Sequence, residues 1–168
     1  MSEHTGPVPI RLATASDLAA INEIYNHYVQ TSTCTYQKDP SSAQERAEWF
    51  AGHDADHPIT VAEQAGEIVG WGALSAFRDR WGYRHTVENS VYVRAGMHRR
   101  GIGRALLTDL IERARALGHH TIVAGISADQ HSSVVLHEQA GFIKVGHLHE
   151  VGHKFDHWLD LVFLQRIL

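Results

Sequence analysis

A short stretch of this chain, His98-Arg99-Arg100-Gly101-Ile102-Gly103-Arg104-Ala105, combines two glycines with three arginines. The glycines remove side chains where the backbone has to come close to another group. An amphipathic, helix-like segment follows, and the first turn of a helix has backbone N–H groups without intrahelical partners, which bind anions. With the arginines around it, this turn suits a diphosphate. A glycine turn with solvated arginines is the alternative.

Two common phosphate-binding motifs do not fit this turn. It lacks the lysine and the G-x-x-x-x-G-K-[ST] spacing of a P-loop. It also lacks the G-x-G-x-x-G order of a dinucleotide-binding fingerprint, and no strand–helix unit of that type opens the chain.

Glu88 is a candidate general base. It lies in the alternating segment 86–93, where valines share one face and Glu88, Ser90 and Tyr92 share the other. Partial burial would raise the pKa of this carboxyl from its reference value of about 4.3. Such a group could take a proton from an ammonium ion directly or through a water. The alternative is an exposed glutamate on a half-solvated sheet.

A basic and aromatic segment precedes that strand. Residues 78–85 read Arg-Asp-Arg-Trp-Gly-Tyr-Arg-His, with guanidinium groups that bind carboxylate or phosphinate in a bidentate manner. This suits an acidic, amino-acid-like substrate. A solvated basic loop is the alternative.

These residues must be positioned by alternating strands and helices. Hydrophobic periodicity, turns and capping residues predict strands at 8–13, 59–63, 68–77, 86–93, 121–126, 142–147 and 158–164. They predict helices at 17–31, 42–51, 131–140 and a segment that carries Leu107, Leu110, Ala114 and Leu117 and ends at Gly118. The strand–helix–strand unit in the middle implies at least one parallel pair. We therefore expect an α/β fold, with a single mixed sheet of about seven strands flanked on both faces by about four helices.

Composition favours one soluble domain spanning residues 1–168. The chain is 43% hydrophobic and 20% charged, with a net charge of −4, so nucleic acid and membrane are not expected as main partners. One cysteine, Cys34, cannot form an internal disulfide, and the first residues lack the apolar core of a signal peptide. A cytoplasmic location is expected.

Two motifs in the right order resemble the Gcn5-related N-acetyltransferases (GNAT). The segment Val91-Tyr92-Val93 followed by residues 98–105 is similar to the acetyl-CoA motif of that family, and Leu136-His137-Glu138-Gln139-Ala140-Gly141-Phe142 is similar to its later helix segment. From about Ile10 to its end, the chain resembles the phosphinothricin and methionine sulfoximine N-acetyltransferase branch of this family. Further matching segments are Tyr25-Asn26, Thr35-Tyr36, Trp49-Phe50, Gly70-Trp71, Arg78-Asp79-Arg80, Tyr83-Arg84, 86–93 and 152–160.

The resemblance implies acetyl transfer from acetyl-CoA to the amine of a small acidic amino acid, with herbicide resistance as one consequence, a homodimer and no metal. It implies Glu88 as base and His137 as a proton donor to the leaving thiolate or a helper in deprotonation. Coenzyme contacts are expected from Val91, Tyr92, Val93, His98, Arg99, Arg100, Gly101, Ile102, Gly103, Arg104, Ala105, Gln130 and Ser133. Substrate contacts are expected from Tyr36, Arg78, Arg80, Tyr83, Thr86, Val87 and Lys154, and Lys154 could make its contact across the dimer interface. Two residues depart from the family pattern. His98 stands where the family has Gln or Arg, and Gln130 stands where the branch often has Asn.

Three alternatives remain at this stage. The acceptor could be another amine, such as a peptide N-terminus, or the chain could be a non-catalytic acetyl-CoA sensor. The 14 histidines raise the question of a metal enzyme, but none of them forms H-E-x-x-H or a zinc-type spacing with cysteine.

Overall fold

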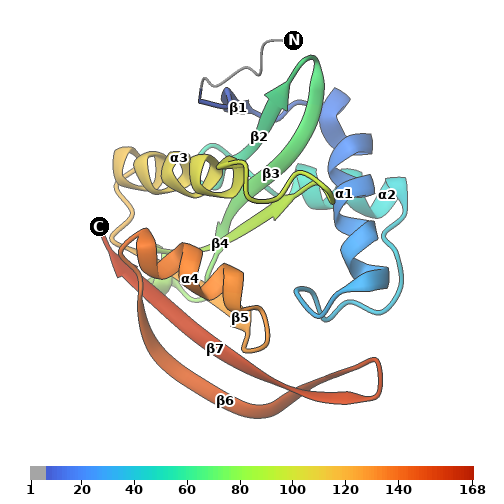
Figure 1. The fold of residues 1–168 in the computed structure, drawn as a ribbon. Coiled ribbons are helices and arrows are strands. Elements are labelled where there is room, and N and C mark those ends of the chain that lie inside the picture. Colours follow the sequence, from blue (N-terminus) through green and yellow to red (C-terminus); the bar gives the residue numbers. More distant parts are fainter. Residues whose placement is uncertain (1–6) are drawn as a thin grey trace.

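The computed structural model describes residues 7–168, in which seven strands form one sheet in the order β1-β2-β3-β4-β5-β7-β6 (Figure 1). The strands are β1 (Ile10–Leu12), β2 (Ile59–Gln64), β3 (Glu67–Ala76), β4 (Thr86–Val93), β5 (Thr121–Ser127), β6 (Ile143–Lys154) and β7 (His157–Ile167). The helices are α1 (Leu18–Thr31), α2 (Ala43–Ala51), α3 (Ile102–Ala116) and α4 (His131–Gln139), with short 3-10 turns at Ala15–Asp17 and Trp81–Tyr83. The predicted α/β fold is confirmed. The expectation of no signal peptide rests partly on residues 1–6, which lie outside the described part.

The sheet is mixed because β4 and β5 run parallel while every other neighbouring pair is antiparallel. The β4–β5 pairing covers three residue pairs and ends where Glu88 faces Val123. On its other edge β4 stays paired with β3 as far as Val93. One edge of β4 therefore has no strand beside it from Asn89 to Val93, and this opening organises the functional site.

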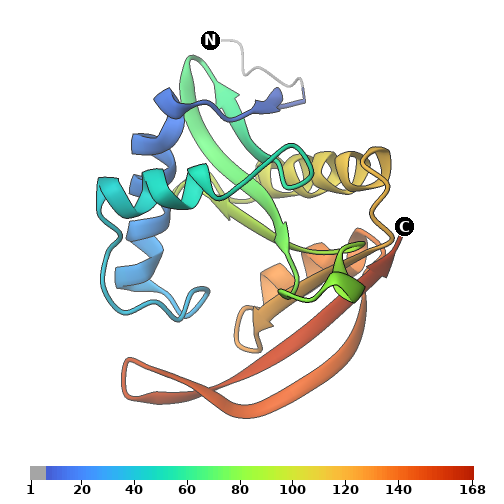
Figure 2. The ribbon, with the colours of Figure 1, turned by 180° about the vertical axis from the view of Figure 1, so that it is seen from behind.

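Helices cover both faces of the sheet. Helices α3 and α4 lie on one face and α1 and α2 on the other (Figures 1 and 2). Val87 of β4 packs in the core under α3, whereas Tyr92 packs in the cluster under α1 and α2. Successive side chains of 86–93 thus point alternately into the two layers of the protein, as predicted, and Glu88 shares its face with Tyr92.

Glycines in β3 bring α3 close to the sheet. A Cβ atom added at Gly72 would lie 2.9 Å from Leu110 Cδ1 and 3.2 Å from the Ser90 carbonyl oxygen. Leu110 is fully buried and cannot withdraw into solvent. The absence of a side chain at Gly72 therefore sets the distance between α3 and the β3–β4 pair.

The C-terminal hairpin is longer than predicted. Strand β6 reaches Lys154 and β7 starts at His157, joined by Phe155 and Asp156, which both have positive φ. The Lys154 ammonium donates to the carbonyl oxygens of Ser32 and Thr35, both at 2.7 Å. These bonds fasten the hairpin tip to the α1–α2 connection. The sequence pattern missed the outer part of the hairpin because its side chains are exposed and do not alternate.

Among residues 7–168, none of the helices has the length and apolar character needed to cross a bilayer.

We predict that Gly72→Ala lowers the free energy of unfolding by about 1–3 kcal/mol, because the new methyl group overpacks the α3 contact. Gly82→Ala is the matched control, since nothing lies within 4 Å of a Cβ at that position. Urea unfolding monitored by circular dichroism measures both variants. Equal stability of the two would contradict the packing role of Gly72.

Candidate active site

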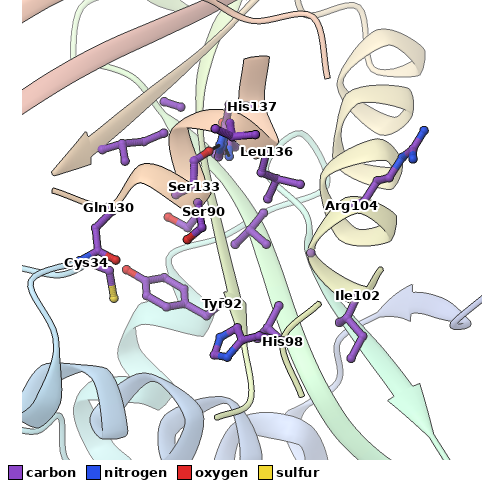
Figure 3. A pocket seen from close by; sticks show the side chains of 18 of the residues that line it. Cys34, Ser90, Tyr92, His98, Ile102, Arg104, Gln130, Ser133, Leu136 and His137 are labelled. Carbon is purple, nitrogen blue, oxygen red and sulfur yellow. Dashed lines mark hydrogen bonds between the residues drawn. The ribbon is translucent and has the colours of Figure 1, made fainter. Parts of the chain in front are cut away.

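A cavity of about 910 Å³ lies where β4 and β5 separate, bounded by α3 and α4 (Figure 3). Residues of both strands line it, together with the start of α3 and the inner side of α4. In Figure 3, Ile102 and Arg104 come from α3 on one side, and Ser133 and His137 from α4 on another. The cavity thus joins the predicted anion-binding turn to the free edge of β4.

The start of α3 has the backbone that an anion site requires. Gly101 is the N-cap residue with φ of 80°, a left-handed conformation that favours glycine, and Arg99 has φ of 63°. The first intrahelical bond runs from the Ala105 N–H to the Gly101 carbonyl at 2.9 Å. The N–H groups of residues 102–104 precede it and are free to bind an anion.

A tyrosine from α1 reaches the same turn. The Tyr28 hydroxyl lies 2.8 Å from His98 Nε2 and also donates to the Val93 carbonyl oxygen. Burial raises the pKa of Tyr28 to about 12, so the hydroxyl stays protonated at neutral pH. His98, a departure from the family pattern, is therefore held in place by α1, a contact that local sequence could not reveal.

His137 is fixed by two hydrogen bonds inside the cavity wall. Its Nδ1 lies 2.8 Å from the Ser133 carbonyl oxygen, which can only accept, so the proton is assigned to Nδ1. Its Nε2 lies 2.9 Å from Asn89 Nδ2 and accepts from it. Burial lowers the pKa of His137, which keeps the ring neutral. Proton donation into the cavity, as predicted from the resemblance, would require the bond to Asn89 to break.

Glu88 stands at the point where the strands part. An added Cβ on Gly125 of β5 would lie 3.3 Å from Glu88 Oε1, so the carboxylate lies over that glycine. Burial raises the pKa of Glu88, and the charge of Arg78 lowers it to a smaller extent. Glu88 is therefore a half-buried carboxylate with a raised pKa, which suits a general base.

The other predicted acceptor contacts lie outside the main cavity. Tyr36 donates to Ser127 Oγ at 2.9 Å, and Lys154 is buried and bound to backbone carbonyls. Arg78, Arg80, Tyr83 and Thr86 belong to the β3–β4 connection and the start of β4.

One predicted substrate contact is wrong. The Val87 side chain is fully buried in the core under α3, on the face of the sheet opposite Glu88, so it has no surface to offer a substrate.

Most predicted coenzyme contacts do line the cavity: Val91, Tyr92, Val93, His98, Arg99, Gly101, Ile102, Gly103, Arg104, Gln130 and Ser133. Arg100 and Ala105 do not line it. The cavity also contains residues that the sequence analysis did not select: Tyr28, Cys34, Asn89 and Ser90. The period-2 pattern of β4 could have identified Ser90, which shares a face with Glu88.

The residues at the cavity fit acetyl-CoA. Unpaired N–H groups at the start of α3 suit its diphosphate. Asn89 lines the cavity and its Oδ1 is buried without a partner among residues 7–168, which suits an amide N–H of the pantetheine arm. The free edge of β4 between these two points offers further backbone donors and acceptors.

Three surface residues lie close enough to hold a metal ion: His147, His149 and Asp160, with ligand atoms within 4.8 Å of one another. Both imidazoles lie within hydrogen-bond distance of Asp160 Oδ2, at 2.7 and 3.2 Å. They belong to the exposed hairpin and none of them lines the cavity.

Residues 10–163 match the acetyltransferase (GNAT) domain family. The chain belongs to the GNAT acetyltransferase family. This GNAT protein is 38% identical over 157 residues to the L-methionine sulfoximine/L-methionine sulfone acetyltransferase of Salmonella typhimurium. The alignment covers 93% of this chain and 92% of that protein.

Solved structures of GNAT proteins agree over almost the whole chain. A phosphinothricin acetyltransferase from Sinorhizobium meliloti in complex with acetyl-CoA gives a TM-score of 0.94 at 38% identity, covering 97% of this chain and 89% of that chain. A ribosomal-protein-alanine N-acetyltransferase from Brucella melitensis gives 0.93 at 41% identity, covering 96% and 100%. The chain is thus an acetyltransferase of the branch that contains the phosphinothricin and methionine sulfoximine enzymes.

We predict that the buried neutral His137 contributes stability above pH 6.5, its ordinary pKa, and that this contribution is lost as the pH falls below that value. The folded state resists protonation, while the unfolded state accepts the proton. The stability advantage of wild type over His137→Gln in urea unfolding should therefore shrink between pH 8 and pH 5. An advantage that grows toward low pH would show that His137 is charged in the folded protein.

Proposed function

We propose that this protein transfers the acetyl group of acetyl-CoA to the amine of a small acidic amino acid of the phosphinothricin or methionine sulfoximine type. The carrying observation is the position of Glu88, at the last β4–β5 pair and beside the cavity that fits the coenzyme. Relatives whose names specify these acceptors support the choice of substrate.

The coenzyme, when bound, supplies an acetyl thioester, and the chain supplies proton transfer and positioning. Glu88 takes a proton from the acceptor ammonium group, directly or through one water, which frees the amine to attack. Backbone N–H groups on the free edge of β4, within 91–93, donate to the thioester oxygen as negative charge develops. His137 and Asn89 hold the wall behind this edge.

The acceptor amino acid is held by its acidic groups. The charge of Arg78 lowers the pKa of Glu88, and we place the acceptor carboxylate against this guanidinium, which can bind it in a bidentate manner. Arg80, Tyr83 and Thr86 belong to the same segment, and Tyr36 approaches from the α1–α2 connection. Polyamines fit a site lined by arginines poorly, because their ammonium groups and the guanidinium groups repel one another.

A second acceptor class has its own support. The Brucella melitensis structure, at 41% identity, is named for the alanine of a ribosomal protein. An acceptor screen that compares free amino acids with Ala-starting peptides, with release of the coenzyme thiol as readout, decides between the classes. Binding of acetyl-CoA without release for any amine would identify a sensor.

We predict that Glu88→Gln lowers kcat by about a hundredfold or more while the affinity for acetyl-CoA persists, because the base is lost and the coenzyme site is not. In wild type, kcat/KM should rise with pH as Glu88 loses its proton, with a midpoint above the ordinary pKa of a glutamate. Steady-state kinetics and calorimetry measure both properties. Unchanged turnover in Glu88→Gln would remove this residue from the mechanism.

We also propose a homodimer built on the C-terminal hairpin. Strand β6 is an edge strand, and apolar side chains stand exposed along the hairpin: Val145, Leu148, Val151 and Trp158. Exposed apolar edges of this kind are typical of protein interfaces.

Light scattering should give twice the mass of the 18.7 kDa chain. Val151→Glu should shift the protein toward the monomer, because it would bury a charge in the interface. Leu12→Glu, on β1, is the control at an exposed apolar residue away from the hairpin. A wild-type monomer, or equal effects of the two variants, would contradict the proposal.

A further inference from the structure

A second cavity of about 420 Å³ lies on the Glu88 face of the sheet, between the sheet and the helices α1 and α2. Ser90 and Tyr92 line both this cavity and the main one, so the two adjoin along β4. Ser75, the cross-strand partner of Glu88, also lines the second cavity. The second cavity therefore begins beside the base and extends toward α2.

Arg46 of α2 lies in the wall of this cavity with its charge unpaired. The residue is 5% exposed, and its Nε donates to Asn22 Oδ1 at 3.1 Å. Among residues 7–168 no carboxylate lies within ion-pair distance of Arg46, and neither terminal nitrogen, Nη1 or Nη2, has a hydrogen-bond partner. Buried arginines are normally paired, so this one is available to an anion.

Aromatic rings hold the guanidinium group in a fixed orientation. Its central carbon lies 4.7 Å from the ring centroid of Tyr25, 4.5 Å from that of Trp49 and 5.9 Å from that of Trp71. Such contacts use the faces of the group and leave the N–H groups on its edge free for a bidentate oxyanion. Trp71 Nε1 is a second buried donor that has no partner in the described part of the chain, and Trp71 lines the same cavity.

One acidic residue, Glu45, also lines this cavity. Its carboxylate accepts the Ser42 N–H at 2.7 Å and is held at the start of α2 as part of the capping box. This carboxylate is engaged by the helix start and does not pair with Arg46.

We propose that Arg46 binds the distal oxygen-bearing group of the acceptor side chain, a phosphinate, sulfone or carboxylate. This inference rests on the proposed function, which places the acceptor amine at Glu88. The α-carboxylate lies two bonds from that amine and stays near Arg78. The side chain is the part that can extend past Ser75 and Ser90 toward Arg46.

Three acceptors with the same α-amine and α-carboxylate test this assignment: L-phosphinothricin, L-methionine sulfone and L-methionine. Arg46→Gln should raise KM for L-phosphinothricin by about ten- to hundredfold, the usual effect of losing a hydrogen bond to a charged group. KM for L-methionine, which lacks a distal oxygen, should change less than about twofold. L-methionine sulfone, whose distal group is neutral, should fall between them.

Two further variants separate recognition from folding. Arg46→Lys keeps the charge but loses the paired N–H donors of the guanidinium group. It should therefore keep part of the preference for L-phosphinothricin over L-methionine. Arg113→Gln removes an arginine that is paired with Asp109 on α3 and should leave the preference unchanged. An equal loss with all three acceptors in the Arg46 variants would show a purely structural role and overturn the inference.

A direct binding measurement keeps the test independent of turnover. With coenzyme A present, L-phosphinothricin should shift the indole N–H resonances of Trp49 and Trp71 but not that of Trp158 on the hairpin, and L-methionine should shift them less. No shift of Trp49 or Trp71 would overturn the inference. If wild type acetylates none of these amino acids, the proposed function fails, and the resonance shifts still decide whether Arg46 binds an oxyanion. If wild type acetylates them and Arg46→Gln keeps the same preference, this inference alone fails.

Discussion

The separation of β4 from β5 after Glu88 is the constraint on which the rest of the site depends. A sheet normally pairs the backbone groups of its inner strands, and unpaired groups inside a protein are costly. Here β4 is central in the strand order, yet one of its edges loses its neighbour over five residues, from 89 to 93. The opening is stable because β3 keeps its full register on the other edge and α3 holds the pair from above. Backbone donors and acceptors are thereby left facing a cavity.

Charge is distributed around this opening according to the chemistry it supports. The positive end of the α3 dipole lies at one end of the cavity with Arg99 and Arg104, which suits a diphosphate. A neutral histidine and an amide, His137 and Asn89, form the wall in the middle. The carboxylate of Glu88 lies beside the cavity, at the last β4–β5 pair, with a raised pKa. An anion, a thioester and an ammonium ion would thus each meet a suitable group in or beside this opening.

Features encoded by neighbouring residues were predictable from the sequence, and features made by distant segments were not. The alternation in 86–93 predicted the bounds and both faces of β4, and the glycines at 101 and 103 predicted a turn that opens a helix, because each depends on local backbone geometry. The contact of Tyr28 with His98 joins residues 70 positions apart, and no period or spacing signals it. The same holds for Lys154, whose partners lie near residue 32.

Val87 shows how far a family resemblance can be carried to single residues. Its place in the motif suggested substrate contact, whereas the strand alternation already placed it on the core face with Val91. The physical pattern was the better guide at this position. Arg46 is the opposite case, since its helix stretch reads as an ordinary amphipathic surface, and only the packing of α2 against Trp71 shows that the charge is buried.

The most direct test of this account is a crystal structure of the protein with acetyl-CoA. We expect the diphosphate at the N–H groups of residues 102–104 and the thioester at the free edge of β4, within reach of Glu88. A coenzyme bound elsewhere, or with its thioester turned away from β4, would contradict it.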